Sequence, residues 1–181
     1  MKKYLMIFAL AACVIVSSLL FAACSLSDYD IIKDAVANTD RALEIVKTIT
    51  VTNGSDEVAS LKEEYTLEGD SYTVVTTERV LNVIGAGEQY SESVTTNTVA
   101  QSDVSFGLLP AESAFAEISY SGELVMTAEV GDLGAVGLAA SDVDGDVTVR
   151  YVVEQSHCTQ ISMQYFTTNG NDVSVLITFT Y

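Results

Sequence analysis

The chain has 181 residues, and its 25 Asp+Glu against 8 Lys+Arg give a net charge of −17 at pH 7. This acidity excludes nucleic acid as a partner, because a phosphate backbone needs a basic surface. The length suits one domain with a hydrophobic core and is short for two. The composition therefore predicts a single acidic domain whose partner is not a polyanion.

Residues 1–23 have the features of an export signal. Two lysines follow the first Met, and residues 4–23 form an apolar run whose only polar members are one Tyr and two Ser. The run ends in two alanines directly before Cys24. Small residues at that point leave the backbone open to a peptidase, so the pattern predicts cleavage before Cys24.

The string Leu20-Phe21-Ala22-Ala23-Cys24 resembles the lipobox of bacterial lipoproteins, although Phe21 stands where Leu is usual. The resemblance implies that Cys24 is acylated, with palmitate or a similar chain, and becomes the mature N-terminus. It also implies that the protein is tethered to a membrane of the cell envelope and lies outside the cytoplasm. Two or more acyl chains hold a protein on a membrane where one does not.

Three alternatives to this anchor remain open. Cys13 follows Leu10-Ala11-Ala12 and fits the lipobox better, but cleavage there would leave apolar residues 14–23 exposed. An uncleaved membrane span is the second, since 20 apolar residues are about long enough to cross a bilayer. Plain secretion is the third. We favour Cys24, and loss of residues 1–23 with their two lysines would bring the net charge to −19.

A single thiol remains beyond the signal, Cys158, beside the only histidine, His157. One cysteine makes no intramolecular disulfide. Neighbouring residues of a strand point to opposite faces, so the pair is not expected to act as a Cys-His nucleophile. We expect a buried thiol and an exposed imidazole.

The mature part divides into a tether, residues 24–27, and a single β-rich domain, residues 28–181. From Asp28 to Lys47 the apolar residues recur at helical spacing, with Ser27 and Asp30 as N-terminal caps. From Thr48 onward the period is two and the composition is rich in Val, Thr and Tyr. The expected fold is α+β and predominantly β, an N-terminal amphipathic helix packed on a curved antiparallel meander that forms a half-open barrel.

Turn signals separate the expected strands at regular intervals. They are Asn53-Gly54, Gly69-Asp70, Gly85-Ala86-Gly87, Ser121-Gly122, Gly131-Asp132, Asp144-Gly145 and Asn169-Gly170. Several of the strands are apolar on one face only: Leu124 to Val130, Val147 to Val153, Ile161 to Tyr165 and Val173 to Tyr181. Such strands make a sheet with one dry face, which needs a cover.

One helix is too small to cover that face, so another segment must help. Residues 104–116 are apolar around the only proline and too irregular for a ladder strand, and residues 134–140 are small and flexible. We expect the first segment to be a lid over an apolar hollow, with four side chains lining or capping it. These ligand-binding candidates are Phe106, Leu108, Leu109 and Phe115.

The lipobox, the N-terminal helix, the long antiparallel meander and the closing hairpin Tyr165–Asp172 before Val173–Tyr181 together resemble the lipoprotein-carrier group in architecture. That group contains the half-barrels of the outer-membrane lipoprotein chaperone and its mycobacterial lipid-binding relatives. The resemblance implies acyl chains held in the hollow of a curved sheet. It includes no diagnostic motif, so it implies no functional residues for this chain.

Catalytic and cofactor motifs are not found in the sequence, so we expect no enzyme and no cofactor. The neighbours Glu63 and Glu64 point apart in a strand and fit solvated charges better than an acid and base pair. Asp142-Val143-Asp144-Gly145-Asp146 has alternate carboxylates, as in calcium loops, but lacks the closing glutamate. We interpret it as an acidic hairpin turn, with no metal site expected.

The functional prediction is an envelope lipoprotein that binds an apolar ligand, such as a lipid, in a β-sheet cavity. The alternative is a surface-tethered module that binds a protein or glycan through a strand edge or a loop. An enzyme ranks third. Whether the chain carries a copurified lipid distinguishes the first two.

Overall fold

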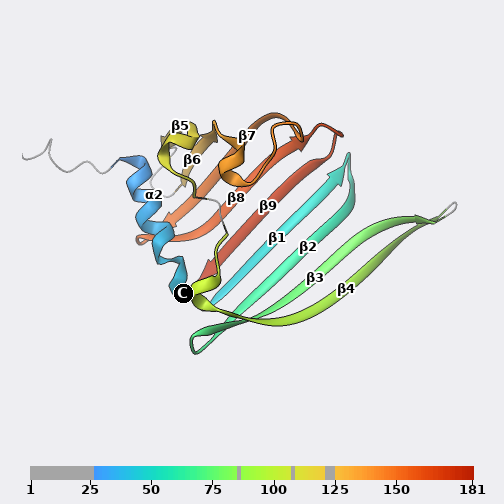
Figure 1. Ribbon diagram of the computed structural model, residues 1–181, viewed down its shortest axis with the longest axis horizontal. Coiled ribbons are helices and arrows are strands. Elements are labelled where there is room, and N and C mark those ends of the chain that lie inside the picture. Colours follow the sequence, from blue (N-terminus) through green and yellow to red (C-terminus); the bar gives the residue numbers. More distant parts are fainter. Residues whose placement is uncertain (1–26, 85–86, 107–108, 121–124) are drawn as a thin grey trace, which may run out of the picture.

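The structure, a computed structural model, describes residues 27–84, 87–106, 109–120 and 125–181. These residues form one short helix and a nine-stranded antiparallel sheet that does not close (Figure 1). The chain is thus predominantly β, as its sequence predicts. No helix among the described residues is long and apolar enough to cross a membrane.

Helix α2 spans Asp28–Ala37 and begins with a capping box. Asp30 donates its backbone N–H to the Ser27 hydroxyl at 3.1 Å, and its carboxylate accepts from the Ser27 backbone N–H at 3.4 Å. Ser27 and Asp30 therefore cap the helix as predicted. The prediction that the helix continues to Lys47 is wrong. It ends at Ala37, and η1 (Asn38–Arg41), a 3₁₀ turn, leads into the first strand.

Residues after Leu43 prefer a strand because both sides of that strand find a partner. Glu44 lies opposite Thr66 and Thr180, and Ile45 lies opposite Tyr65 and Phe179. The strands are β1 (Glu44–Asn53), β2 (Asp56–Glu68), β3 (Ser71–Ile84), β4 (Gly87–Ala100), β5 (Phe115–Tyr120), β6 (Val125–Val130), β7 (Val143–Glu154), β8 (His157–Thr167) and β9 (Asp172–Thr180).

The sheet order is β4-β3-β2-β1-β9-β8-β7-β6-β5. It contains two meanders, β1 to β4 and β5 to β9, joined where β1 pairs with β9. The expected single meander in chain order is therefore wrong. Because β4 and β5 are the two opposite edges, the chain between them, residues 101–114, must cross from one edge to the other (Figure 1). We call residues 101–114 the strap.

Three predicted hairpin turns are confirmed, Asn53-Gly54, Gly69-Asp70 and Asn169-Gly170, and each glycine has a positive φ. Asp144-Gly145 is not a hairpin turn, which corrects the interpretation of the acidic string. It lies inside β7, whose register with β8 shifts between Asp144 and Thr148. Between these two pairs β7 has two residues more than β8, and the irregularity accommodates them without ending the strand.

The hairpin between β7 and β8 turns at Gln155 and Ser156, which no sequence signal indicated. Their φ angles are +50° and +66°, the left-handed region that a two-residue hairpin loop requires. The predicted turns at 85–87 and 121–122 fall wholly or mostly outside the described residues.

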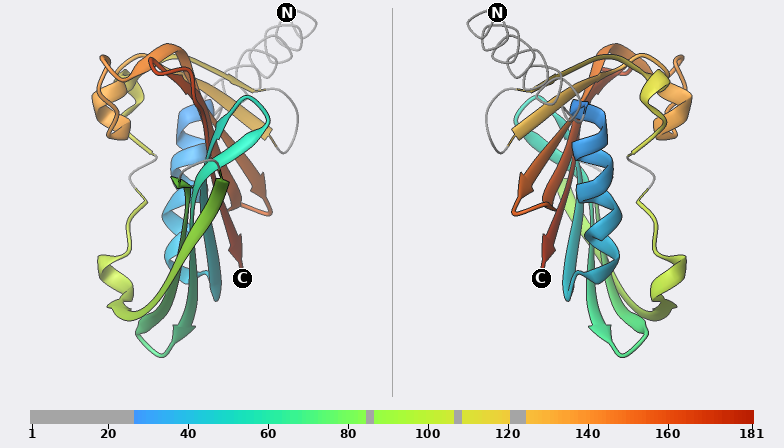
Figure 2. Two further views of the ribbon diagram at one scale, coloured as in Figure 1. Left: turned by 90° about the vertical axis from the view of Figure 1, so that its right-hand side faces the viewer. Right: turned by 90° about the vertical axis from the view of Figure 1, so that its left-hand side faces the viewer.

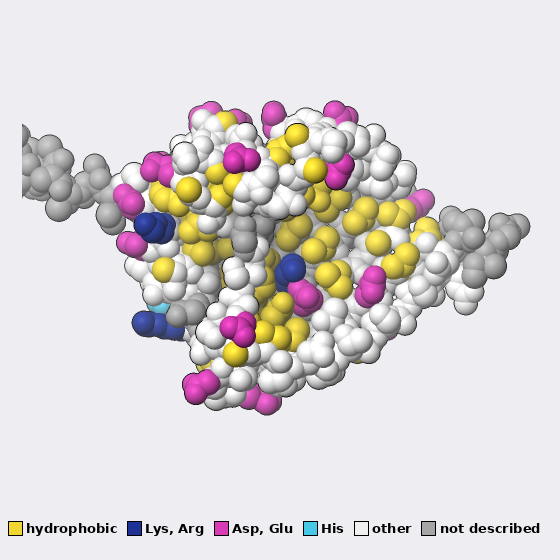
Figure 3. Space-filling view, in the orientation of Figure 1, with side chains coloured by type: hydrophobic (Ala, Val, Ile, Leu, Met, Phe, Trp, Pro, Cys, Tyr) yellow, Lys and Arg dark blue, Asp and Glu magenta, His cyan; other side chains and the backbone are white. Residues whose placement is uncertain are grey.

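The predicted one-sided strands are confirmed in β6, β7, β8 and β9 except at their ends: Tyr165 is half-buried, Tyr181 is exposed beyond the end of β9, and Leu124 lies outside the described residues. The other inward side chains are buried: Met126, Ala128, Val130, Val147, Val149, Tyr151, Val153, Ile161, Met163, Val173, Val175, Ile177 and Phe179. Helix α2 packs on this face against β5, β7 and β8. Figure 2 shows the helix and the strap on the same side of the sheet. Figure 3 shows hydrophobic side chains gathered on this face beside them.

Candidate ligand-binding cavity

The strap is fixed to the sheet at one end and to the helix near the other. Gln101 donates its backbone N–H to the Asp70 carbonyl at 3.0 Å, next to the β2–β3 turn. The Tyr29 hydroxyl of α2 donates to the Pro110 carbonyl at 2.8 Å. Two 3₁₀ turns, η2 (Gln101–Asp103) and η3 (Glu112–Ala114), lie at its two ends. The Ala114 carbonyl accepts the backbone N–H groups of Gly131 and Asp132 at 2.7 and 2.8 Å, so the strap is fixed at both ends.

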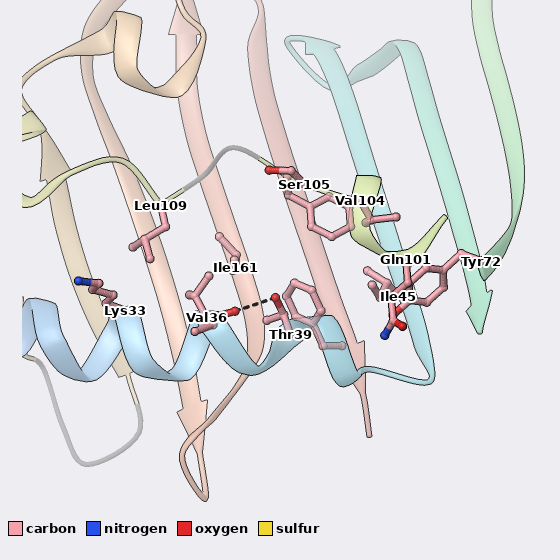
Figure 4. Close-up of a pocket in the computed structure, with 13 residues that line it drawn as sticks. Lys33, Val36, Thr39, Ile45, Tyr72, Gln101, Val104, Ser105, Leu109 and Ile161 are labelled. Atoms are coloured by element: carbon pink, nitrogen blue, oxygen red, sulfur yellow. Dashed lines mark hydrogen bonds between the residues drawn. The ribbon is translucent and has the colours of Figure 1, made fainter. Parts of the chain in front are cut away.

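A cavity of about 380 Å³ lies between the strap, the helix end and the sheet (Figure 4). Most of its lining side chains are apolar, and they come from three parts of the fold. They are Lys33, Val36, Ala37 and Thr39 from α2 and η1, Ile45, Tyr72, Ile161 and Phe179 from the sheet, and Gln101, Val104, Ser105, Phe106 and Leu109 from the strap. The volume falls within the range of roughly 300–1,000 Å³ typical of small-molecule sites.

Aromatic rings of the strap and the sheet pack against one another beside the cavity. Phe106 meets Tyr65 edge-on with ring centroids 5.6 Å apart and Phe179 at 5.9 Å. Tyr65 in turn meets Tyr72 at 6.1 Å. The Tyr72 ring is buried, and its hydroxyl donates to the buried Ala42 carbonyl at 2.7 Å. These edge-on contacts hold Phe106 of the strap against the sheet.

Three ionisable side chains of the sheet, Tyr65, Tyr151 and Cys158, are neutral at neutral pH. Burial raises the pKa of Tyr65 to about 12, and the nearby charge of Glu63 adds to the rise. Burial likewise raises the pKa of Tyr151 above its usual range and that of the Cys158 thiol to about 12. At neutral pH these groups are protonated. None of the three lines the cavity, and Lys33 is the one Lys, Arg, Asp or Glu among its described lining residues.

The four predicted ligand-binding residues separate into three groups. Phe106 and Leu109 line the cavity. Phe115 starts β5, and its ring lies 6.3 Å from that of Tyr29; among the described residues it is not part of the lining. Leu108, like the predicted acylation site Cys24, lies outside the described residues.

The sequence analysis missed the residues that form the rest of the lining. Val36 lies on the predicted helix, but nothing in its spacing distinguishes a cavity wall from a core contact. Tyr72 and Ile45 belong to strands whose inward faces were not assigned. The alternation of Tyr72 and Val74 was the available signal, since both are buried on one face of β3.

His157 and Cys158 are neighbours in β8; the predicted buried thiol is confirmed, whereas the imidazole is half-buried rather than exposed. The thiol is buried and donates to the Gln160 carbonyl at 3.4 Å. The imidazole Nδ1 lies 2.9 Å from the Gln155 carbonyl, and its ring packs on Tyr181 at 4.7 Å. Within the described ranges no three His, Cys, Asp or Glu side chains are placed to share a metal ion.

Comparisons with known proteins do not assign a family. No protein-family model matches the chain, and no curated protein matches it. Among solved structures, the chain has some similarity to one described as an N-terminal dehydratase from the difficidin assembly line, with 9% identity over 84% of this chain and 83% of that one. The TM-score is 0.18, so this similarity carries no argument about fold or activity.

Proposed function

We propose that this chain is a membrane-tethered extracytoplasmic lipoprotein that binds an apolar ligand, such as an acyl chain, in the cavity under the strap. The observation that carries the proposal is the cavity of about 380 Å³ between helix, sheet and strap, lined mainly by Val, Ile, Leu, Phe and Tyr. With about 30 Å³ for each water-sized group, it has room for about a dozen non-hydrogen atoms.

The affinity of such a site follows from burial alone. Each buried methylene contributes about 0.8 kcal/mol, so a chain of about ten methylenes gains roughly 8 kcal/mol before the costs of association. The site therefore suits a ligand that is held reversibly.

The proposed location supports this ligand class. An export signal ending in a lipobox would place the domain beside a membrane, where acyl chains are abundant. An open sheet wrapped round a helix and strap also resembles the half-barrels of the lipoprotein-carrier group. The chain is acidic, with a net charge of −17, so an acyl anchor at Cys24 rather than surface charge would keep it at an anionic membrane.

Blocking the cavity tests the proposal. Ser105 lines the cavity and is exposed, whereas Ser102 is an exposed strap residue outside the lining. In the full chain, Ser105→Trp should fill the space and abolish the fluorescence increase of Nile red, a neutral apolar dye. Ser102→Trp, the matched control, should leave it unchanged. Equal dye binding by both variants would contradict the proposal.

One observation favours the alternative, a module that binds a protein partner. Strand β4 is an edge strand of 14 residues, and its side chains from Gln89 to Thr98 are exposed. A long uncovered edge can accept a strand from another chain. If the wild-type chain takes up no apolar dye, this edge becomes the better candidate site.

A further inference from the structure

A second cavity, of about 210 Å³, lies on the other side of the strap. Val104 and Ser105 line both cavities, so these two strap residues form their common wall. The second cavity is lined by β2, β3 and β4, whereas helix α2 packs mainly on β5, β7 and β8. One elongated molecule could therefore occupy both cavities by passing beside this wall.

The second cavity differs from the first in its chemistry. Five of its lining residues are polar, and they combine both hydrogen-bonding roles: Glu63, Thr76, Asn97, Asp103 and Ser105. Hydroxyl and amide side chains donate and accept, whereas the carboxylates accept only. Valines and Tyr65 complete the lining. This combination of polar and apolar side chains matches a small polyhydroxylated group.

The charges of the lining residues limit which polar group could bind in the second cavity. Glu63 is already paired with Lys47, whose Nζ lies 2.9 Å from its carboxylate, and it also accepts from the Tyr65 hydroxyl at 3.2 Å. Asp103 adds a second carboxylate, and Lys or Arg is not part of the described lining. A phosphate or sulfate would be repelled there. A cation would find only Asp103, because Lys47 neutralises Glu63.

We propose that the ligand is amphipathic, with an uncharged, hydroxyl-rich head group such as a glycosyl or glyceryl group in the second cavity and its apolar part under the strap. This inference rests on the proposed function and specifies the ligand class. Thr76, Asn97 and Ser105 exchange hydrogen bonds with the head-group hydroxyls, and the two carboxylates accept from them.

The test compares amphiphiles that share one tail. Dodecyl glucoside, dodecyl phosphate and dodecyltrimethylammonium, each below its micelle concentration, compete with Nile red on the full chain. The glucoside should compete best. Asn97→Ala should weaken its competition about fivefold, the loss expected for one hydrogen bond, and leave Nile red binding unchanged. Thr96→Ala, on the opposite face of β4, is the matched control.

The outcomes separate this inference from the proposed function. If Nile red does not bind, the proposed function fails, and this inference fails with it. If Nile red binds but the phosphate or the ammonium compound competes best, or all three compete equally, the head-group inference is wrong and the proposed function stands. The inference is also overturned if Asn97→Ala and Thr96→Ala behave alike.

Discussion

Leu109→Asp separates ligand binding from folding. Leu109 lies in the strap, lines the first cavity and is only half-buried. Full burial of a leucine contributes about 1.5–3 kcal/mol, so a half-buried one contributes about 1 kcal/mol to folding. We therefore expect Leu109→Asp to lower the free energy of unfolding by about 1 kcal/mol.

The effect on an apolar ligand should be larger. A carboxylate in the lining removes an apolar contact and must lose part of its hydration when the ligand enters. A combined cost of about 2 kcal/mol or more corresponds to at least a roughly thirtyfold weaker Kd. Lys33 also lines the cavity, and it could pair with the new carboxylate and reduce the effect of the charge. Leu109→Asn serves as a second variant that adds no charge. It should also weaken binding, because it puts a polar group in the apolar lining.

Titration with a fluorescent fatty acid measures the Kd, and urea unfolding measures the stability. Leu43→Asp is the matched control, because Leu43 also lies outside the strands and is 55% exposed. It should change neither quantity much. The reasoning is refuted if Leu109→Asp binds the fatty acid as tightly as the wild type, or if its loss of binding only follows a loss of folding.

Three further predictions concern the anchor, the thiol and the missed turn. Cys24→Ala should abolish labelling by an alkyne fatty acid and leave an uncleaved precursor, whereas Cys13→Ala should be neutral; the opposite pattern would reassign the anchor. Burial raises the Cys158 pKa from 9.0 to about 12, so the folded state holds this proton more tightly. The stability that the protonated thiol contributes is complete below about pH 9 and is lost towards pH 12. The free energy of unfolding of Cys158→Ala, measured with urea, should therefore fall less steeply over that range than that of the wild type. Replacing Gln155-Ser156 by Asn-Gly should raise the free energy of unfolding by about 1 kcal/mol, because both residues have positive φ; an unchanged or lower value would show that the turn is not strained.

The sequence predicted the parts of the fold that depend on local pattern. Alternation identified the buried faces of β6 to β9, because every second side chain of a strand lies on the same face. Val149 and Ile177 are examples of these buried side chains. Ser27 and Asp30 identified the start of α2 for a similar reason, since a capping box is a contact within three residues. Glycine in the sequence identified three turns, because those turns need a residue with a positive φ.

The parts that depend on distant pairing could not be predicted. Residues 42–47 have helical spacing, yet β2 and β9 draw Glu44 and Ile45 into a strand. The junction of β1 with β9 follows from which strand edges remain free, and no local signal encodes it. Residues 104–116 were predicted as an irregular apolar lid; residues 104–114 belong to the strap, whereas Phe115 and Ala116 begin β5, which corrects the end of that prediction. The path of the strap across the sheet follows from that junction. For this reason Phe106 and Leu109 were identified as lining residues while Tyr72 was missed.

The central claim is that the cavity under the strap holds an apolar molecule. The most direct test is native mass spectrometry of the full chain after gentle extraction from cells. We predict a non-covalent adduct that collisional activation removes, that organic extraction identifies as a lipid, and that is absent from Ser105→Trp but present in Ser102→Trp. A wild-type protein without such an adduct, or an adduct equally abundant in both variants, would contradict the claim.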